Sequence, residues 1–360
     1  MSHKTKINVH YDPRLDFIRF IAFTFVFVCH FVNNGGLGIT NNPDVWWSNS
    51  TLQKISDFGR EGVTLFFVLT GFLIGRNLLR DYLENGYVSI KRFYIRRIAR
   101  IWPLYFLFIL CCSIINFYSN NTGFTNTEVP WLLTFTYNWA LYFDRAGGTI
   151  SSITWSLSIE EQIYLLLPLV VLINHRKRFH LFTIMFFTVG FSSLIFFDLT
   201  DTGALYNTFS YFLPISFGLF LGIYENYIRG RLLKNYFVSL SSLLYVLTYP
   251  FFYSDLKLLN SSSIIFILSS LYFFTLLNLT DRFLNRRIIF LIAKLGKVTY
   301  GCYLFHFVIL FAFINFEIFC SPYNGFEPLG IILAFMATIF ISFLSYYRFE
   351  AFFISLSKRS

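Results

Sequence analysis

Residues 13–33 read PRLDFIRFIAFTFVFVCHFVN, and most of this stretch is Phe, Ile, Val, Leu or Ala. A helix that crosses the hydrocarbon core of a bilayer needs about 20 predominantly apolar residues. The stretch is long enough, and its formally charged residues all stand near its start. It therefore predicts a membrane-spanning helix and, with it, the fold of an integral membrane protein.

The composition of the whole chain points the same way. Its 360 residues are 56% hydrophobic, 22% aromatic and only 13% charged, whereas soluble domains are roughly 45–50% apolar and about 25% charged. With 49 Phe residues and so few charges, the chain cannot cover a compact globule with polar surface. This excludes a soluble enzyme, a coiled coil and a disordered tail. The five cysteines show no CxxC or Cys/His spacing, so we expect neither a disulfide framework nor a metal site.

Ten apolar runs follow one another along the chain, and we predict that each forms a membrane-spanning helix. Lys and Arg near span ends favour the cytoplasmic side. With both termini in the cytoplasm, all but four of the 29 Lys and Arg residues lie on that side. We therefore predict an all-α polytopic protein in which residues 1–360 form a single membrane domain, with the polar residues 2–14 cytoplasmic and no appended soluble domain. The runs cover about 17–33, 61–79, 99–117, 153–173, 181–197, 205–225, 236–253, 262–279, 298–317 and 328–347.

The first of these helices carries Asp16, Arg19 and His30. Arg19 and His30 are eleven residues apart, about three helical turns, so they share a face. Asp16 and Arg19 fit a structural ion pair at the cytoplasmic boundary as well as they fit a binding role. Packing alone does not explain a histidine at position 30 of an otherwise apolar helix. The imidazole side chain is well suited to proton transfer near neutral pH. Because ionisable residues inside spans are costly, we predict that His30 is catalytic.

A second polar segment is TWSLSIEEQIYLLLP, residues 154–168. At i, i+4 spacing, Ser156, Glu160 and Tyr164 line one stripe of the helix, whereas Glu161 falls with leucines. Glu160 therefore has the polar face, and we predict that it meets His30. Trp155, Ser156 and Tyr164 are expected to support the site or to contact substrate.

Two further elements carry basic side chains or histidine. Arg97 and Arg100 share a face at the cytoplasmic start of the third helix and could hold phosphate oxygens, although ordinary positive-inside anchoring explains them too. His306 follows Tyr303 by one turn, and a lone histidine beside a tyrosine is more often a packing residue than a catalyst. We expect His306, like Asp16, to support the site rather than to react.

The longest polar interruption, about 118–152, is predicted to lie outside the membrane. Its aromatic residues suit stacking on sugar rings, but a belt at the headgroup level is the simpler explanation. These residues and the neighbouring amide are Trp131, Tyr137, Asn138, Trp139 and Tyr142.

In order and position, these elements resemble the acyltransferase-3 family of integral membrane acyltransferases, and the resemblance covers essentially the whole chain. The matching elements are Arg19-x10-His30, the second-helix segment 62–74, Arg97-x-x-Arg100 before Pro103, and the segment 155–160, Trp-Ser-Leu-Ser-Ile-Glu.

The resemblance implies transfer of an acyl group, usually acetyl, from acyl-CoA to a hydroxyl of a cell-envelope carbohydrate such as O-antigen or exopolysaccharide, in the bacterial inner membrane. Arg97, Arg100 and Arg19 would bind the donor on the cytoplasmic side, and no metal is implied. His30 would take the proton of the sugar hydroxyl while Glu160 holds the imidazole tautomer. A transient acyl-histidine is equally compatible with these residues.

Two other classes of function remain open from the residues themselves. Histidine and glutamate inside spans also form proton relays, as in a proton-coupled transporter or flippase of an envelope precursor. That alternative is weaker because the cytoplasmic arginine pair and the His/Glu meeting point lack a relay partner through the remaining helices, and because no inverted repeat is visible. Binding of a CoA analogue would discriminate the two, since a transporter has no reason to bind one. A purely structural membrane protein is a more distant possibility.

Overall fold

The structure is a computed structural model that describes residues 11–35, 57–118, 125–147, 150–171, 176–200, 204–232, 235–257, 262–282, 284–316, 318, 320–321, 325–326 and 328–357. Residues 1–10, which make up most of the polar segment expected in the cytoplasm, lie outside the described part, as does Lys54 of the charge pattern.

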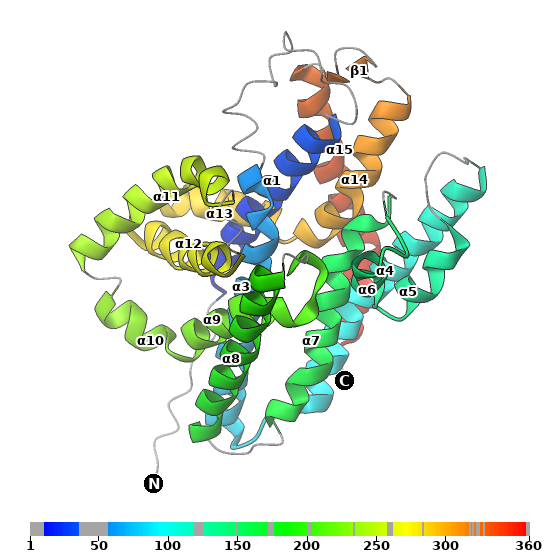
Figure 1. Cartoon of the computed structure of the whole chain (residues 1–360). Helices are drawn as coiled ribbons and strands as arrows, with labels where there is room; N and C mark the ends of the chain where they lie inside the picture. The colour runs from blue at the N-terminus through cyan, green and yellow to red at the C-terminus, as the bar shows by residue number, and fades with distance from the viewer. Residues whose placement is uncertain are drawn as a thin grey trace. The chain divides into compact units, whose positions relative to one another are not determined.

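The described elements are almost all helical (Figure 1), as expected for a chain that must satisfy its backbone hydrogen bonds within each membrane segment. Two strands of two residues form a short antiparallel pair in which Cys320 faces Phe326. The α-helices are α1 Pro13–Gly35, α3 Glu61–Asn85, α4 Ile90–Tyr118, α5 Val129–Leu133, α6 Tyr137–Tyr142, α7 Trp155–Val171, α8 Arg176–Thr200, α9 Phe212–Ile223, α10 Glu225–Tyr227, α11 Tyr236–Lys257, α12 Ser262–Arg282, α13 Arg286–Gly296, α14 Thr299–Asn315, α15 Pro328–Ser345 and α16 Ala351–Leu356. The other elements are the 3-10 turns η2 Asn126–Glu128, η3 Ser152–Thr154, η4 Ala204–Tyr206 and η5 Thr208–Tyr211, the π-helical turns η6 Ile228–Leu232 and η7 Tyr346–Glu350, and the strands β1 Cys320–Ser321 and β2 Gly325–Phe326.

The chain divides into two compact units whose segments alternate along the sequence. Unit 1 consists of Met1–Ala22, Val63–Ile90 and Ile163–Gly296, and unit 2 consists of Phe23–Gly62, Lys91–Gln162 and Lys297–Ser360. Helices α1, α3 and α7 each contribute residues to both.

In unit 1, glycines bring α3 and α9 into backbone contact. A Cβ at Gly71 would lie 2.2 Å from the carbonyl oxygen of Ile215, and one at Gly218 would lie 2.0 Å from that of Val68. Gly75 and Gly222 repeat the arrangement one turn further on, at Leu219 and Phe72. Each helix therefore presents a Gly-x-x-x-Gly pair to the other, the small-residue packing typical of membrane helices.

Helices α11 and α12 of unit 1 pack side by side (Figure 1), and buried polar side chains join them. The Ser239 hydroxyl donates to the Asn278 carbonyl oxygen (3.2 Å), and the Asn278 amide donates to the Ser242 hydroxyl (3.0 Å). Such interhelical hydrogen bonds stabilise helix pairs in a membrane, and they explain why α11 tolerates polar residues on its inner face.

In unit 2, α14 packs along α15. Gly301 of α14 packs closely on Ser342 of α15: a Cβ added to the glycine would lie 3.2 Å from the serine Cβ. Phe335 of α15 stacks on Phe23 of α1, with ring centroids 6.0 Å apart. These contacts place the second half of α1 beside α14, the helix that carries His306.

Within the described residues, six helical segments are long and apolar enough to cross a membrane, and a seventh is added if α13 and α14 form one broken span. Each of the ten predicted runs contains a helix, but α7 has 17 residues and α9 only 12, fewer than the about 20 that a full crossing takes. The ten-span count and the orientation therefore stay predictions. The six segments are Pro13–Val32, Asp57–Asn85, Ile90–Phe117, His180–Asp198, Ile264–Arg282 and Leu329–Leu356.

Candidate functional site

The predicted catalytic residue His30 lies against a second histidine in unit 2. Its ring on α1 meets the ring of His306 on α14 edge to face, with centroids 5.2 Å apart, and that of Phe307 at 5.3 Å. His30 is half-buried, whereas His306 is fully buried. His306, which was expected to support the site, is thus a direct neighbour of the predicted catalyst.

His306 is held in one tautomer by its own helix. Its Nδ1 lies 2.7 Å from the Tyr303 carbonyl oxygen and 3.2 Å from that of Cys302. A carbonyl oxygen only accepts hydrogen bonds, so Nδ1 carries the proton and donates it. Nε2 then presents a lone pair, and it is fully buried with no hydrogen-bond partner among the described residues.

Tyr303 joins this histidine to the start of α7. Its hydroxyl donates to the Ile153 carbonyl oxygen (3.0 Å) and lies 2.6 Å from the Ser156 hydroxyl, which is therefore the donor of that bond. The Tyr303 and His306 rings are 5.7 Å apart. Ser156, predicted to support the site, is connected to the histidine pair through this tyrosine.

The two adjacent carboxylates of α7 have different surroundings. Glu160 is half-buried, and Glu161 is buried. The Trp102 indole of α4 donates to Glu161 Oε2 (2.9 Å), while Glu161 Oε1 has no partner among the described residues. Glu161 thus faces α4, in agreement with its expected separation from the Glu160 stripe. The meeting of Glu160 with His30 stays a prediction.

The loop after α4 folds onto α7 rather than extending outward. The Gln162 amide donates to the Phe135 carbonyl oxygen (2.7 Å) and to the Asn138 side chain (2.8 Å), and the Trp139 indole donates to Gln162 Oε1 (3.2 Å). Tyr137 and Asn138 are fully buried. The two surface roles considered for this loop, stacking on sugar rings and a belt at the headgroup level, are therefore wrong for Tyr137 and Asn138, because both side chains are buried and make their polar contacts inside the protein.

The remaining predicted residues lie at separate places. Trp155 begins α7, and Tyr164 is buried further along it, in the part that belongs to unit 1. Arg97 lies over the Phe93 ring of α4, with its guanidinium carbon 5.6 Å from the ring centroid. Arg97 and Arg100 are both half-buried, so neither is a fully solvated surface charge.

Arg19 forms an ion pair with Asp16 one turn earlier on α1. The Tyr11 hydroxyl also donates to Asp16, at 2.7 Å. Burial, together with this hydrogen bond to a carboxylate, raises the pKa of the Tyr11 phenol, so it remains a donor throughout the physiological pH range. The structural ion pair considered from the sequence is therefore present, and donor binding by Arg19 stays a prediction.

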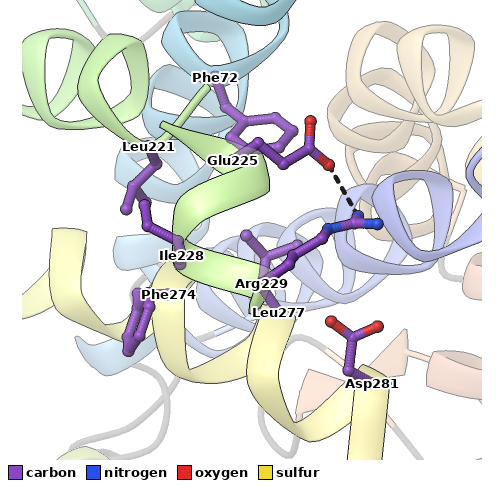
Figure 2. Close-up of a pocket in the computed structure, with 8 residues that line it drawn as sticks. All are labelled: Phe72, Leu221, Glu225, Ile228, Arg229, Phe274, Leu277 and Asp281. Carbon is purple, nitrogen blue, oxygen red and sulfur yellow. Dashed lines mark ion pairs between the residues drawn. The ribbon is translucent and has the colours of Figure 1, made fainter. Parts of the chain in front are cut away.

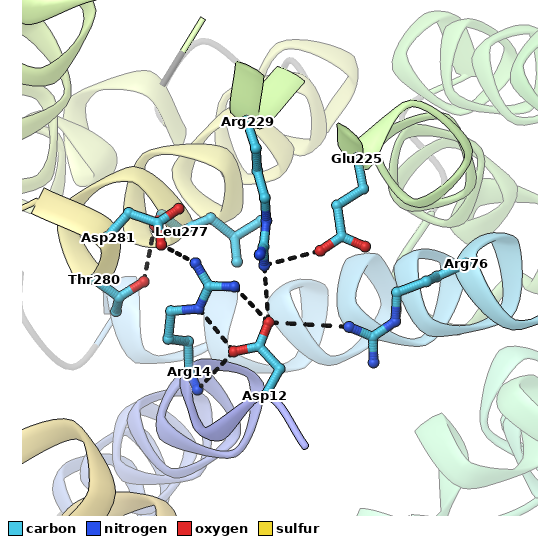
Figure 3. A network of polar contacts seen from close by, with 8 residues as sticks. All are labelled: Asp12, Arg14, Arg76, Glu225, Arg229, Leu277, Thr280 and Asp281. Atoms are coloured by element: carbon cyan, nitrogen blue, oxygen red, sulfur yellow. Dashed lines mark hydrogen bonds and ion pairs between the residues drawn. The ribbon is translucent and has the colours of Figure 1, made fainter. Parts of the chain in front are cut away.

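Unit 1 contains a larger ionic cluster that the sequence patterns did not predict. Asp12 lies just before α1 and pairs with Arg14 (2.6 Å), Arg229 (2.8 Å) and Arg76 (3.9 Å), as Figure 3 shows. Arg14 also pairs with Asp281 of α12. Their pairing could not be read from spacing, because Arg14 and Asp281 are 267 residues apart in the sequence.

Arg229 extends this cluster to a small open pocket. Figure 2 shows Arg229 reaching Glu225, at 2.8 Å, with Asp281 also lining the pocket. The acidic and basic side chains of the cluster balance one another, so we assign it a structural role. Apolar residues complete the lining: Phe72, Leu221, Ile228, Phe274 and Leu277.

Taken together, unit 2 brings His30, His306, Tyr303 and Ser156 into one cluster. A neutral imidazole with a bare ring nitrogen is equipped to take a proton from a hydroxyl and to return it to a leaving group. Among the described residues, no group of three or more His, Cys, Asp or Glu side chains is arranged to hold a metal ion. The sequence predicted His30 as the catalyst and His306 as a residue that supports the site, and the structure places the two rings next to each other.

Comparison with known proteins gives a family and several partial relatives. The sequence pattern of a family described as an acyltransferase domain matches residues 12–347. A Staphylococcus aureus (strain COL) protein provisionally named an O-acetyltransferase is 26% identical over 183 residues, covering 48% of this chain and 27% of that protein. The peptidoglycan O-acetyltransferase OatA of Listeria monocytogenes is 28% identical over 183 residues, covering 48% of this chain and 26% of OatA. The match thus spans about a quarter of the length of these relatives. No solved structure matches the chain.

Proposed function

Because this chain belongs to the acyltransferase-3 family, we propose that it transfers an acyl group, most simply acetyl, from acyl-CoA to a hydroxyl of a cell-envelope carbohydrate. The observation that carries the proposal is His30, an imidazole in an otherwise apolar helix of a chain whose family match runs from residue 12 to residue 347. The Listeria relative, by its name, O-acetylates peptidoglycan, which supports a carbohydrate acceptor such as an O-antigen or exopolysaccharide. Residues 1–360 act in this proposal as one membrane domain of the bacterial inner membrane.

The donor is bound from the cytoplasmic side. Arg97 and Arg100 lie in the first half of α4, and Arg19 lies in the first half of α1. Guanidinium groups recognise phosphate oxygens through paired N–H donors, and the donor carries several phosphates. The acyl thioester would then reach toward His30, eleven residues further along α1 from Arg19.

His30 takes the proton of the acceptor hydroxyl as the hydroxyl oxygen attacks the thioester carbonyl. Glu160 stabilises the imidazolium that forms. The proton then passes to the thiolate of CoA as the C–S bond breaks. An acyl-histidine route would use the same residue as nucleophile.

The test is direct transfer by the full-length protein in detergent or nanodiscs. Labelled acetyl-CoA is supplied with envelope polysaccharide from a strain that lacks the chain, and the product is followed by proton NMR for new O-acetyl signals. A CoA analogue should also remain bound on dilution, which a flippase would not require. If the purified protein neither retains the analogue nor forms O-acetyl product, the proposal is wrong.

Arg97→Ala and Arg100→Ala are each expected to raise KM for acetyl-CoA more than they lower kcat, because phosphate contacts are made in the ground state and the transition state alike. Glu160→Gln should do the reverse, since its carboxylate acts as charge develops. Steady-state kinetics with varied acetyl-CoA measures both. Topology labelling must accompany the arginine variants, because they also weaken the positive-inside signal. If correctly oriented variants bind acetyl-CoA with unchanged affinity, Arg97 and Arg100 serve only to anchor the helix in the membrane.

The proposed orientation predicts which sites a membrane-impermeant thiol reagent reaches in intact cells. Gly147→Cys, in the loop after α6, should be labelled from outside, and Tyr87→Cys, in the segment before α4, should not. Both positions are exposed, and a side chain at Gly147 meets no atom within 4 Å. The parent chain, with its native cysteines, gives the background. Labelling of Tyr87→Cys from outside would overturn the ten-span orientation.

A further inference from the structure

The His306 side chain has one polar atom, Nε2, that has no hydrogen-bond partner among the described residues. Nδ1 donates to two carbonyl oxygens of its own helix, so Nε2 is fixed as an acceptor. No described residue supplies a hydrogen bond to Nε2, although the side chain is fully buried. A buried acceptor without a donor is costly, and such atoms in native proteins call for an explanation.

Most of the ring's neighbours cannot satisfy this acceptor. Phe23 and Phe27 lie at centroid distances of 5.9 and 6.5 Å, and Phe307 lies at 6.3 Å. These rings offer no N–H or O–H donor. The Tyr303 hydroxyl donates to the Ile153 carbonyl oxygen instead. The remaining neighbour is His30, whose ring centroid is 5.2 Å away and whose imidazole always carries at least one N–H. Movement of the His30 ring alone would bring that N–H toward Nε2 and leave the Nδ1 hydrogen bonds of His306 intact.

We propose that His306 is a positioning residue for His30: its Nε2 accepts the N–H of the His30 ring during the reaction and fixes the tautomer in which the other His30 nitrogen faces the acceptor hydroxyl. This rests on the proposed acyl transfer and adds a second histidine to it. In this proposal the neutral imidazole of His306, rather than the Glu160 carboxylate, orients the His30 ring, as a carboxylate does in hydrolase triads, and Glu160 keeps only the electrostatic stabilisation of the imidazolium.

The proton balance follows from this arrangement. The acceptor oxygen forms a bond to the thioester carbonyl carbon, and its proton moves to the free nitrogen of His30. The resulting imidazolium has two N–H groups, and one of them remains hydrogen-bonded to His306 Nε2. As the C–S bond breaks, the other N–H gives its proton to the thiolate of CoA. His306 returns unchanged, with its proton still on Nδ1.

The experiment is a double-mutant cycle on the full chain with acetyl-CoA as donor. His306→Phe keeps an aromatic ring but removes the acceptor. It should lower kcat about 10- to 100-fold, the loss seen when a partner that orients a metal-binding histidine is removed, with KM for acetyl-CoA unchanged. In a His30→Ala background the same change should cost nothing more, because a positioning residue acts only through its partner. A further loss in that background would overturn the proposal.

Rescue by a conservative variant separates the acceptor from packing. The amide oxygen of His306→Gln can accept a hydrogen bond, so this variant should recover part of the activity lost in His306→Phe. Phe27→Leu is the matched control, because it removes an aromatic contact of His306 and keeps Nε2. Activity in Phe27→Leu as low as in His306→Phe, or no recovery in folded His306→Gln, would identify a packing role and overturn the proposal.

A readout independent of turnover covers the case in which the His306 variants do not fold. Nitrogen NMR of histidine-labelled wild-type protein should show His306 with its proton on Nδ1. A proton on Nε2 would overturn the proposal. The cycle also distinguishes failure of the proposed function from failure of this inference. A wild-type protein that neither transfers acetyl groups nor binds CoA would contradict the proposed function. An active wild-type protein with a fully active His306→Phe variant would contradict only the role of His306.

Discussion

His30→Ala is expected to lower kcat for acyl transfer by about 10²–10⁴-fold, the usual contribution of a general base, while leaving the protein folded and able to bind acyl-CoA. The effect should be larger if His30 also forms an acyl intermediate. The measurement is turnover of labelled acetyl-CoA by purified variant and wild-type protein at equal amounts of folded protein.

Two controls make the result specific to the imidazole. Donor binding, measured by retention of a CoA analogue, should be unchanged, since the phosphate contacts are assigned to arginines. Thermal unfolding should also change little, because His30 is only half-buried. Near-normal turnover by the variant would show that another residue is the general base, and His306 would be the first to be tested.

Gly218→Ala is expected to cost more than about 3 kcal/mol of stability, the upper end of what overpacking with side chains usually costs. The new Cβ would lie 2.0 Å from the Val68 carbonyl oxygen and 2.8 Å from the Phe72 backbone nitrogen. Both are backbone atoms, so α3 and α9 would have to separate, and the contacts of Gly71, Gly75 and Gly222 would weaken with them. A large fall in melting temperature and loss of monodisperse protein in detergent are the expected observations.

Gly230→Ala is the matched control in the same unit. A Cβ at Gly230 meets no atom within 4 Å, and its φ lies outside the left-handed region. The variant should melt within a few degrees of wild type. Equal losses in the two variants would show that the chain is generally sensitive to alanine in place of glycine, and would contradict close packing of α3 on α9.

The sequence was sufficient for the helical class, and it singled out His30 as the candidate catalyst. Apolar length predicts helices because a bilayer removes the alternatives. His30 was identifiable because an imidazole is conspicuous among Phe, Val and Ile. The separation of Glu161 from the Glu160 face also followed from helical geometry, and Trp102 is the partner that the structure provides for Glu161.

Features that depend on which distant segments meet could not be predicted. The glycines of α3 and α9 are visible in the sequence, but their pairing joins segments about 140 residues apart. Tyr137 and Asn138 were expected at a surface because they lie in a polar loop. In the structure, the Gln162 amide donates a hydrogen bond to Asn138 and holds that loop against α7. His306 was predicted to support the site, but its partner could not be predicted, because the unsatisfied Nε2 becomes visible only when the neighbouring helices are in place.

The ionic cluster around Asp12 has a consequence for the order in which the protein is made. Arg14 and its partner Asp281 are 267 residues apart, and Asp12 and Arg229 are 217 apart. At a synthesis rate of about 5–20 residues per second, the ribosome reaches Asp281 roughly 10–50 s after it has passed Arg14. Before that, Asp12 can pair with Arg14, then with Arg76 and Arg229 as each is synthesised, but Arg14 still lacks Asp281. The start of α1 therefore gains its ionic partners one after another, and a nascent chain that stalls before the end of α12 would leave Arg14 without the last of them.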